Sequence, residues 1–179
     1  MFEAERAAML FFQNIRIPVV NEIMKFFSAI GDTGLVWFVI IAALLVFKKT
    51  RRIGFDILLS LAVCWCVSNL VIKPIISRVR PYVQIPELTV LIKYPPDTSF
   101  PSGHACSSFT CAIVGDRSFR DKRIRAGFWL LASLITISRI YVGVHYPTDL
   151  LAGALIGVLG GLAVYKLNKR FIPAGFLAK

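Results

Sequence analysis

Acidic residues are scarce in this sequence, and histidine occurs only twice. Asp and Glu number 10 against 21 Lys and Arg, which gives a formal net charge of +11. In a soluble protein such an excess would suggest nucleic-acid binding. Here, however, the basic residues form short clusters between apolar blocks, a pattern typical of membrane topology and not of a surface that binds a phosphate backbone. We therefore expect no nucleic-acid partner.

The sequence also lacks the residue groupings that hold metals. Its four cysteines, at positions 64, 66, 106 and 111, lie inside apolar segments and have no zinc-like spacing to the two histidines. We interpret them as small apolar packing residues. Because no carboxylate cluster suited to Mg²⁺ is present either, we expect no metal and no cofactor.

A removable signal peptide is not expected, and neither is a soluble fold. The first residues, MFEAERAAML, lack a basic leading region and a cleavage site after a continuous apolar run. Hydrophobic residues make up 56% of the 179, and the mean hydropathy is +0.69. Both values exceed those of ordinary soluble domains, and the apolar residues form long blocks. We predict one all-α domain over residues 1–179, an integral membrane six-helix bundle. The expected spans are 18–30, 35–47, 53–72, 102–115, 126–143 and 147–164.

Two stretches allow more than one interpretation. Residues 1–17 could form an interfacial helix before a short span at 18–30, or residues 1–30 could form a single element kinked at Pro18. The mixed stretch 82–100 is predicted to be an extracytoplasmic loop. A loop of this length is often functional, and we interpret it as a lid or a lipid-access element.

The alternation of six spans predicts the topology. The basic linkers at 48–52 and 117–125 and the tail after 166 fall on one side of the membrane, and residues 73–101 and 139–147 fall on the other. The positive-inside rule makes the first side cytoplasmic. We therefore expect a multi-pass protein of the cytoplasmic membrane with both termini in the cytoplasm.

Three polar islands share the predicted outer side: KPIISRVRP (73–81), PSGH (101–104) and SRIYVGVHYPTD (138–149). Ionisable groups at such places are expensive and are usually functional. Lys73, Arg80 and Arg139 supply cations that no run of carboxylates balances. Together they predict a phosphate site, because Arg offers a planar fork to phosphate oxygens and Lys a point charge. Ser102 and Gly103, at the start of a helix, can add free backbone N–H groups to the same site.

The histidines provide candidate catalytic groups. His145 and Asp149 are four residues apart, so that the carboxylate can hold one imidazole nitrogen and leave the other free to attack. Pro147 places His145 just outside the helix, so the pairing depends on the turn geometry. His104 has no carboxylate close in sequence, and suits a general acid that protonates the leaving oxygen.

These residues form a pattern that resembles the three-part signature of the type 2 phosphatidic acid phosphatase superfamily. Its parts here are K-x6-RP from Lys73, PSGH from Pro101, and SR-x5-H-x3-D from Ser138, with no departure. The resemblance covers residues 31–165. It implies a six-helix membrane bundle that hydrolyses a lipid phosphate through a phosphohistidine, without metal. The implied roles are His145 as nucleophile, Asp149 as its orienter and His104 as acid; the implied phosphate-binding residues are Lys73, Arg80, Ser102, Gly103 and Arg139.

The resemblance implies a phosphorylated membrane lipid as substrate, and we favour undecaprenyl diphosphate. Phosphatidylglycerophosphate and phosphatidate are alternatives, because no residue pattern in the sequence indicates which lipid tail is bound. A different class of function is a transporter or flippase that binds such a lipid without cleaving it. That function would need the cations but not His145 beside Asp149. The vanadium-dependent haloperoxidases share the superfamily's anion site. Because they are soluble and much larger, we do not expect their function here. The sequence does not predict an oligomeric state.

Overall fold

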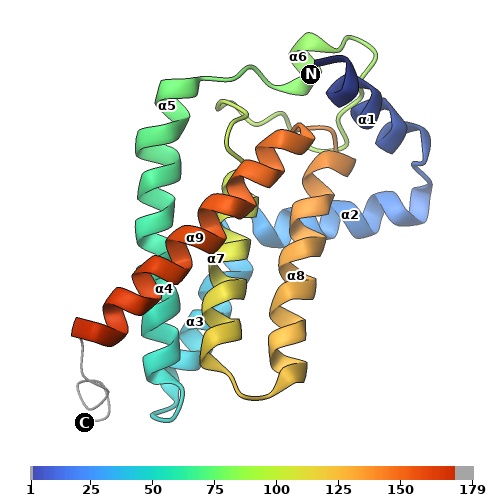
Figure 1. Cartoon of the computed structure of the whole chain (residues 1–179). Coiled ribbons are helices and arrows are strands. Elements are labelled where there is room, and N and C mark those ends of the chain that lie inside the picture. Colours follow the sequence, from blue (N-terminus) through green and yellow to red (C-terminus); the bar gives the residue numbers. More distant parts are fainter. Residues whose placement is uncertain (1, 172–179) are drawn as a thin grey trace.

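The computed structural model describes residues 2–171, which contain helices and no strand (Figure 1). As expected, six helices form the bundle, and a further helix, α1, lies beside one end of it. The bundle helices are α2 (Pro18–Gly31), α3 (Leu35–Val46), α4 (Arg51–Cys66), α7 (Gly103–Ser118), α8 (Lys122–Tyr141) and α9 (Pro147–Phe171). The remaining helical pieces are α1 (Phe2–Asn14), η1 (Asp32–Gly34), η2 (Val67–Ile72), α5 (Lys73–Ile76) and α6 (Pro81–Gln84).

Local sequence explains where the bundle helices begin. Helices α2 and α9 each start at a proline, whose missing N–H would have no partner in the first turn. Helix α8 starts after Asp121, whose side chain accepts a hydrogen bond from the Arg123 N–H at 2.8 Å. Helix α7 starts after Ser102, which caps it in the same way. These starts lie close to those that the sequence predicts.

Helix α4 continues without a break through the π-helical segment η2 into α5 (Figure 1). All the residues at these junctions keep right-handed helical dihedral angles. The rod ends at Ser77, whose φ of 44° lies in the left-handed region. It therefore extends beyond the predicted end at residue 72 and carries Lys73 on its last turn.

Helix α7 lies at the centre of the bundle, as its small residues predict. It packs against α4, α8 and α9, and most of its residues from Ala105 to Gly115 are buried. A glycine stripe on α9 permits the closest of these contacts. A Cβ atom added at Gly153 would lie 2.5 Å from the Ser102 carbonyl oxygen, and one at Gly157 would lie 2.4 Å from the Cys106 carbonyl oxygen. The stripe therefore serves close helix packing beneath the site.

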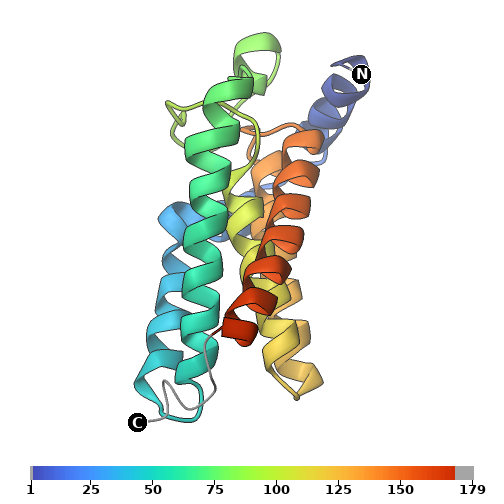
Figure 2. The same ribbon diagram turned by 60° about the vertical axis from the view of Figure 1, so that its left-hand side comes forward.

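The predicted sorting of polar segments to two ends of the bundle is confirmed as an arrangement in space. At one end, Arg52 donates to the Asn168 carbonyl oxygen at 3.1 Å, and the Tyr165 hydroxyl donates to the Arg117 carbonyl oxygen at 2.8 Å. These bonds join the three basic stretches. The three polar islands meet at the other end (Figures 1 and 2).

The two termini, residue 1 and residues 172–179, lie outside the described residues, so their predicted location on one side stays a prediction. The helices nearest to them lie at opposite ends of the bundle (Figure 1). Helix α1 lies at the end of the bundle that holds the polar islands, whereas α9 finishes at Phe171 at the opposite end (Figure 1). The reason is that α2 lies across α8 instead of running along it. Thr33 (φ 54°) and Gly34 (φ 75°) then form a turn, from which α3 runs towards the other end.

Within residues 2–171, four segments are long and apolar enough to cross a membrane, judged by length and composition alone: Pro18–Val46, Arg51–Gln84, Lys122–Tyr141 and Pro147–Phe171. The first of them joins α2 and α3, which the sequence predicts as separate spans. Helix α7 is not among the four, because it is short and rich in small and polar residues.

Candidate active site

The three polar islands surround one cavity of about 1,040 Å³. Six of the eight predicted site residues line it: Lys73, Arg80, Gly103, His104, Arg139 and His145. The other two, Ser102 and Asp149, are fully buried behind this lining. The remaining wall includes apolar side chains of α3 and α4, namely Phe38, Leu58, Leu61, Ala62 and Trp65. The cavity therefore has a cationic end and an apolar end.

His145 lies in the turn between α8 and α9, with 2% of its surface exposed. Its Nε2 atom is 3.4 Å from Arg80 Nη1, and its Nδ1 atom is 3.5 Å from Asp149 Oδ2. The second distance is long for a hydrogen bond, as is common in catalytic pairs without substrate. Burial lowers the pKa of His145 to about 3, with the cations Arg139 and Arg80 acting in the same direction. The imidazole is therefore neutral near pH 7, the state that a nucleophile requires.

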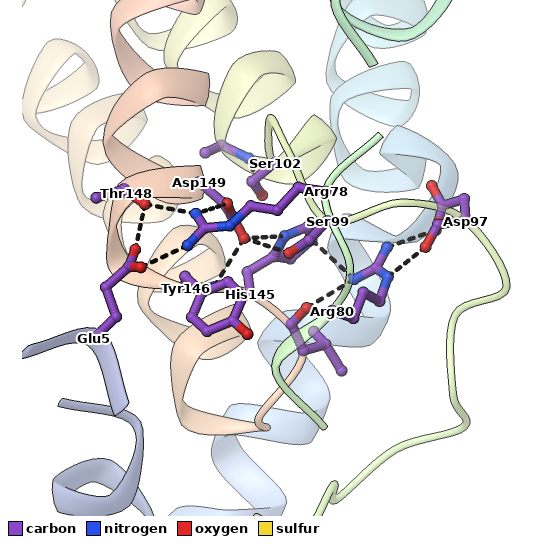
Figure 3. A network of polar contacts seen from close by, with 12 residues as sticks. Glu5, Arg78, Arg80, Asp97, Ser99, Ser102, His145, Tyr146, Thr148 and Asp149 are labelled. Atoms are coloured by element: carbon purple, nitrogen blue, oxygen red, sulfur yellow. Dashed lines mark hydrogen bonds and ion pairs between the residues drawn. The ribbon is translucent and has the colours of Figure 1, made fainter. Parts of the chain in front are cut away.

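Asp149, in the first turn of α9, is held from several directions (Figure 3). Its Oδ2 atom accepts hydrogen bonds from the Ser99 hydroxyl and from the Tyr146 N–H at 2.9 Å. Its Oδ1 atom accepts one from Arg78 Nη1 at 2.7 Å. The carboxylate is thus fixed with Oδ2 on the side of His145, as an orienting residue needs.

Lys73 and Arg80 come together as predicted, but they are not without a counter-charge. The Asp97 carboxylate, in the stretch before α7, pairs with Lys73 Nζ. It also lies 2.5 Å from Arg80 Nη2 (Figure 3). Arg80 also donates to the backbone oxygens of Asp97 and Val144. Burial alone would raise the pKa of the Asp97 carboxyl, but Lys73 and Arg80 lower it to about 2. A carboxylate therefore lies against two of the cations that the sequence assigns to phosphate.

His104 also finds a carboxylate, although none is near it in sequence. Its Nε2 atom lies 3.0 Å from Asp32 Oδ1, beyond the end of α2. Gly31 permits this approach, because a Cβ there would be 2.8 Å from His104 Cδ2. Arg139 Nη1 is 3.6 Å from the same Asp32 oxygen and donates to the Ser28 hydroxyl, and its Nε has no partner. Asp32 thus faces both a candidate acid and a candidate phosphate ligand.

The expectation that Ser102 presents a free backbone N–H is wrong. That N–H donates to the Asp149 carbonyl oxygen at 3.0 Å, and the Ser102 hydroxyl accepts from the Ala105 N–H at 3.4 Å. Ser102 therefore joins α7 to α9 and caps α7. Gly103 does line the cavity, and a Cβ there would have only one neighbouring atom within 4 Å, Asn69 Oδ1 at 3.7 Å. Its N–H remains a candidate donor at the helix start.

Four charged residues of this end were not predicted from the sequence as parts of the site: Glu5, Asp32, Arg78 and Asp97. Two of them could have been found from their positions in the sequence, because Arg78 lies within the first island and Asp97 lies four residues before PSGH. Glu5 and Asp32 had no such signal, because their partners are more than 70 residues away in the chain.

The assembled groups define a site for an anion. A buried neutral imidazole, two histidine–carboxylate pairs and three cations surround the cationic end of the cavity. Such a site can bind a phosphoryl group and stabilise the charge of its transfer. In the described residues, no group of three or more His, Cys, Asp or Glu side chains is placed to hold a metal ion.

Comparison with known proteins identifies the family. Residues 53–173 match the family model of the PAP2 superfamily. The chain is 35% identical, over 79% of its length and 68% of the relative's, to an undecaprenyl-diphosphatase of Sulfolobus acidocaldarius. It is 30% identical, over 93% of its length and 74% of the relative's, to a lipid A 4′-phosphatase of Porphyromonas gingivalis. The crystal structure of a PAP2-type phosphatidylglycerolphosphate phosphatase from Bacillus subtilis matches 96% of this chain and 88% of its own, with a TM-score of 0.76 and 29% identity.

This chain therefore belongs to the PAP2 superfamily, and it is a phosphatase with a phosphorylated lipid as its class of substrate. The resemblance inferred from the three sequence islands is confirmed. The roles of the individual site residues, in contrast, rest on the geometry described above and stay predictions.

Proposed function

We propose that this protein hydrolyses a lipid phosphate or diphosphate through a phosphohistidine intermediate, without a metal ion, and that its substrate is undecaprenyl diphosphate. The reaction takes place at the extracytoplasmic face of the cytoplasmic membrane. In this proposal residues 1–179 form one transmembrane domain, residues 1–17 lie at the interface and residues 82–100 form an extracytoplasmic loop.

The observation that carries the proposal is the position of the His145 Nε2 atom. It lies in the cavity wall, 3.4 Å from Arg80 Nη1, while Asp149 lies on its other side. A phosphoryl group within reach of this nitrogen would also contact the guanidinium of Arg80. Arg139 and Lys73, which line the same cavity, can bind its remaining oxygens.

The steps follow from these positions. The His145 Nε2 lone pair attacks the terminal phosphorus, so that a P–N bond forms and the P–O bond to the lipid breaks. His104 gives its proton to the leaving oxygen. Water then attacks the phosphohistidine, the P–N bond breaks, and inorganic phosphate leaves while His104 takes the proton of the water. With undecaprenyl diphosphate the products are undecaprenyl phosphate and phosphate.

The apolar end of the cavity supports a lipid substrate. Phe38 of α3 and Trp65 of α4 line it and are also half-exposed on the surface of the bundle. An alkyl or prenyl chain can therefore extend from the cationic end along the two helices. Such a wall accepts many chains, so the choice of undecaprenyl diphosphate rests on the Sulfolobus relative. Phosphatidylglycerophosphate and phosphatidate remain the alternative substrates.

The test is phosphate release by the purified protein in detergent with EDTA present. Undecaprenyl diphosphate, phosphatidylglycerophosphate and phosphatidate are offered in parallel, and His145→Ala is the control. We expect release that is fastest from undecaprenyl diphosphate and absent in the variant. Faster release from another lipid would overturn the substrate assignment, and loss of release with EDTA would overturn the metal-free mechanism. Tight lipid binding without release would favour a carrier.

A further inference from the structure

A second polar network contacts the Asp149 carboxylate through residues that do not line the cavity (Figure 3). Its centre is Arg78, which does not line the cavity. Arg78 Nη1 donates to Asp149 Oδ1 and to the Thr148 hydroxyl oxygen, each at 2.7 Å. Its Nη2 lies 2.5 Å from Glu5 Oε2, and its guanidinium carbon lies 4.0 Å from the centre of the Tyr146 ring. Both terminal nitrogens of this guanidinium thus have hydrogen-bond acceptors, and an aromatic ring lies next to it.

The two carboxylate oxygens of Asp149 have different partners because of Arg78. It binds Oδ1, while Oδ2 remains on the side of His145 Nδ1. Asp149 has no exposed surface, and Arg78 is the Lys or Arg side chain that pairs with it in the described residues. A buried carboxylate without a cation is strongly unfavourable. The pairing therefore offsets the cost of burying this charge and fixes the carboxylate in one orientation.

Glu5 brings the helix α1 into the same network. It is 5% exposed and binds both Arg78 and the Thr148 hydroxyl. The fully buried Met9 docks the same helix next to Tyr146 and Leu150. Helix α1 lies outside the segment 53–173 that matches the family model. An element that the family match does not include thus supports the orienting carboxylate.

We propose that Arg78, held in place by Glu5 of α1, is a positioning residue that fixes Asp149 and, through it, the tautomer of His145. The proposal rests on the proposed role of His145 as nucleophile. With Asp149 fixed, the His145 proton stays on Nδ1, and Nε2 keeps the lone pair that attacks phosphorus. Without Arg78 or Glu5, Asp149 moves or loses its charge, and the proton is shared between the two nitrogens.

The first measurement reads this tautomer without any activity. The chain contains only two histidines, so ¹⁵N-histidine labelling of the whole protein in detergent gives few signals, and His104→Gln assigns them. In wild type we expect neutral His145 with a protonated Nδ1 and a bare Nε2. In Glu5→Gln and Arg78→Gln the shifts of the two nitrogens should move towards each other. Unchanged His145 shifts in both variants would overturn the proposal.

The second measurement separates kcat from KM for lipid hydrolysis. We expect kcat to fall about 10- to 100-fold in Arg78→Gln, because small displacements of catalytic groups have effects of this size. KM should stay within about threefold, since Arg78 does not line the cavity. Arg78→Lys should recover part of kcat, because an ammonium keeps the charge but cannot bind Asp149 and Glu5 as a fork does.

Arg6→Gln is the matched control on α1. Arg6 neighbours Glu5 but pairs with Glu87 at the surface, 2.6 Å away, and has no contact with Asp149. We expect it to leave kcat and the His145 signals unchanged. Equal losses in Arg6→Gln and Glu5→Gln would show that α1 acts only through general docking, which contradicts the proposal. If Arg78→Gln fails to fold, the His145 signals and kcat of Glu5→Gln still test the proposal. Absence of phosphate release in wild type would refute the proposed function alone, because the NMR readout still applies.

Discussion

Replacing Asp97 by Asn should tighten the binding of phosphate, because the Asp97 carboxylate lies against Lys73 and Arg80. These cations lower the pKa of Asp97 from 3.8 to about 2, although burial alone would raise it. At about 1.36 kcal/mol per pKa unit, that change corresponds to about 2.4 kcal/mol. The side chain is 51% exposed, so solvent screening reduces the value to about 1 kcal/mol. The variant should therefore bind the anion about fivefold more tightly.

The assay is inhibition of lipid phosphate release by inorganic phosphate and by vanadate, at one pH and one low salt concentration. The inhibition constants should fall in Asp97→Asn. Glu87→Gln is the control, because Glu87 belongs to the same loop and pairs with Arg6 instead of the site cations. Weaker inhibition in Asp97→Asn would refute the reasoning, since it would mean that Asp97 organises the two cations and does not compete with phosphate for them.

Three other predictions concern the phosphate site, the helix packing and the pH dependence. Arg139→Lys should lower kcat/KM about 100-fold, because a buried point charge cannot replace a fork; wild-type kinetics would exclude bidentate binding. Gly153→Ala should lower the free energy of unfolding by about 1–3 kcal/mol, since its Cβ would lie 2.5 Å from the Ser102 carbonyl oxygen. Gly127→Ala, with no atom within 4 Å of the new Cβ, should not destabilise, and equal unfolding midpoints for the two would contradict the packing argument. The third, His145→Gln, concerns pH. Because burial lowers the pKa of folded His145 to about 3, against 6.5 when unfolded, acid favours the unfolded chain. Wild type should lose about 2 kcal/mol of stability between pH 8 and pH 5, and His145→Gln should lose less in unfolding experiments in detergent; equal losses would argue against a buried neutral imidazole.

Properties that depend on local sequence were predicted well. Hydropathy and flanking charges located the six bundle helices, because apolar runs and helix caps are encoded within each segment. His145 and Asp149, four residues apart in the sequence, were predicted to pair, and His145 Nδ1 lies 3.5 Å from Asp149 Oδ2. The small residues of α7 and the glycine stripe of α9 are likewise local features of the sequence, and they permit the close contact of the two helices.

Properties that depend on residues distant in the chain were not predicted from the sequence. The crosswise position of α2 results from its packing on α8 and from left-handed dihedral angles at Thr33 and Gly34, and hydropathy contains neither. This position places α1 at the end of the bundle opposite to the one at which α9 finishes (Figure 1). The carboxylates Asp32 and Asp97 likewise reach the site only through the fold, so that the cations were wrongly predicted to be unbalanced.

In the proposed mechanism His145 carries the phosphoryl group during the reaction. The direct measurement is rapid acid-free quenching of the protein with terminally ³²P-labelled undecaprenyl diphosphate, followed by peptide mapping. We expect a label that is stable to base and lost in acid, on the peptide containing His145, and absent in His145→Ala. Turnover without a labelled protein, or a label on another residue, would contradict it.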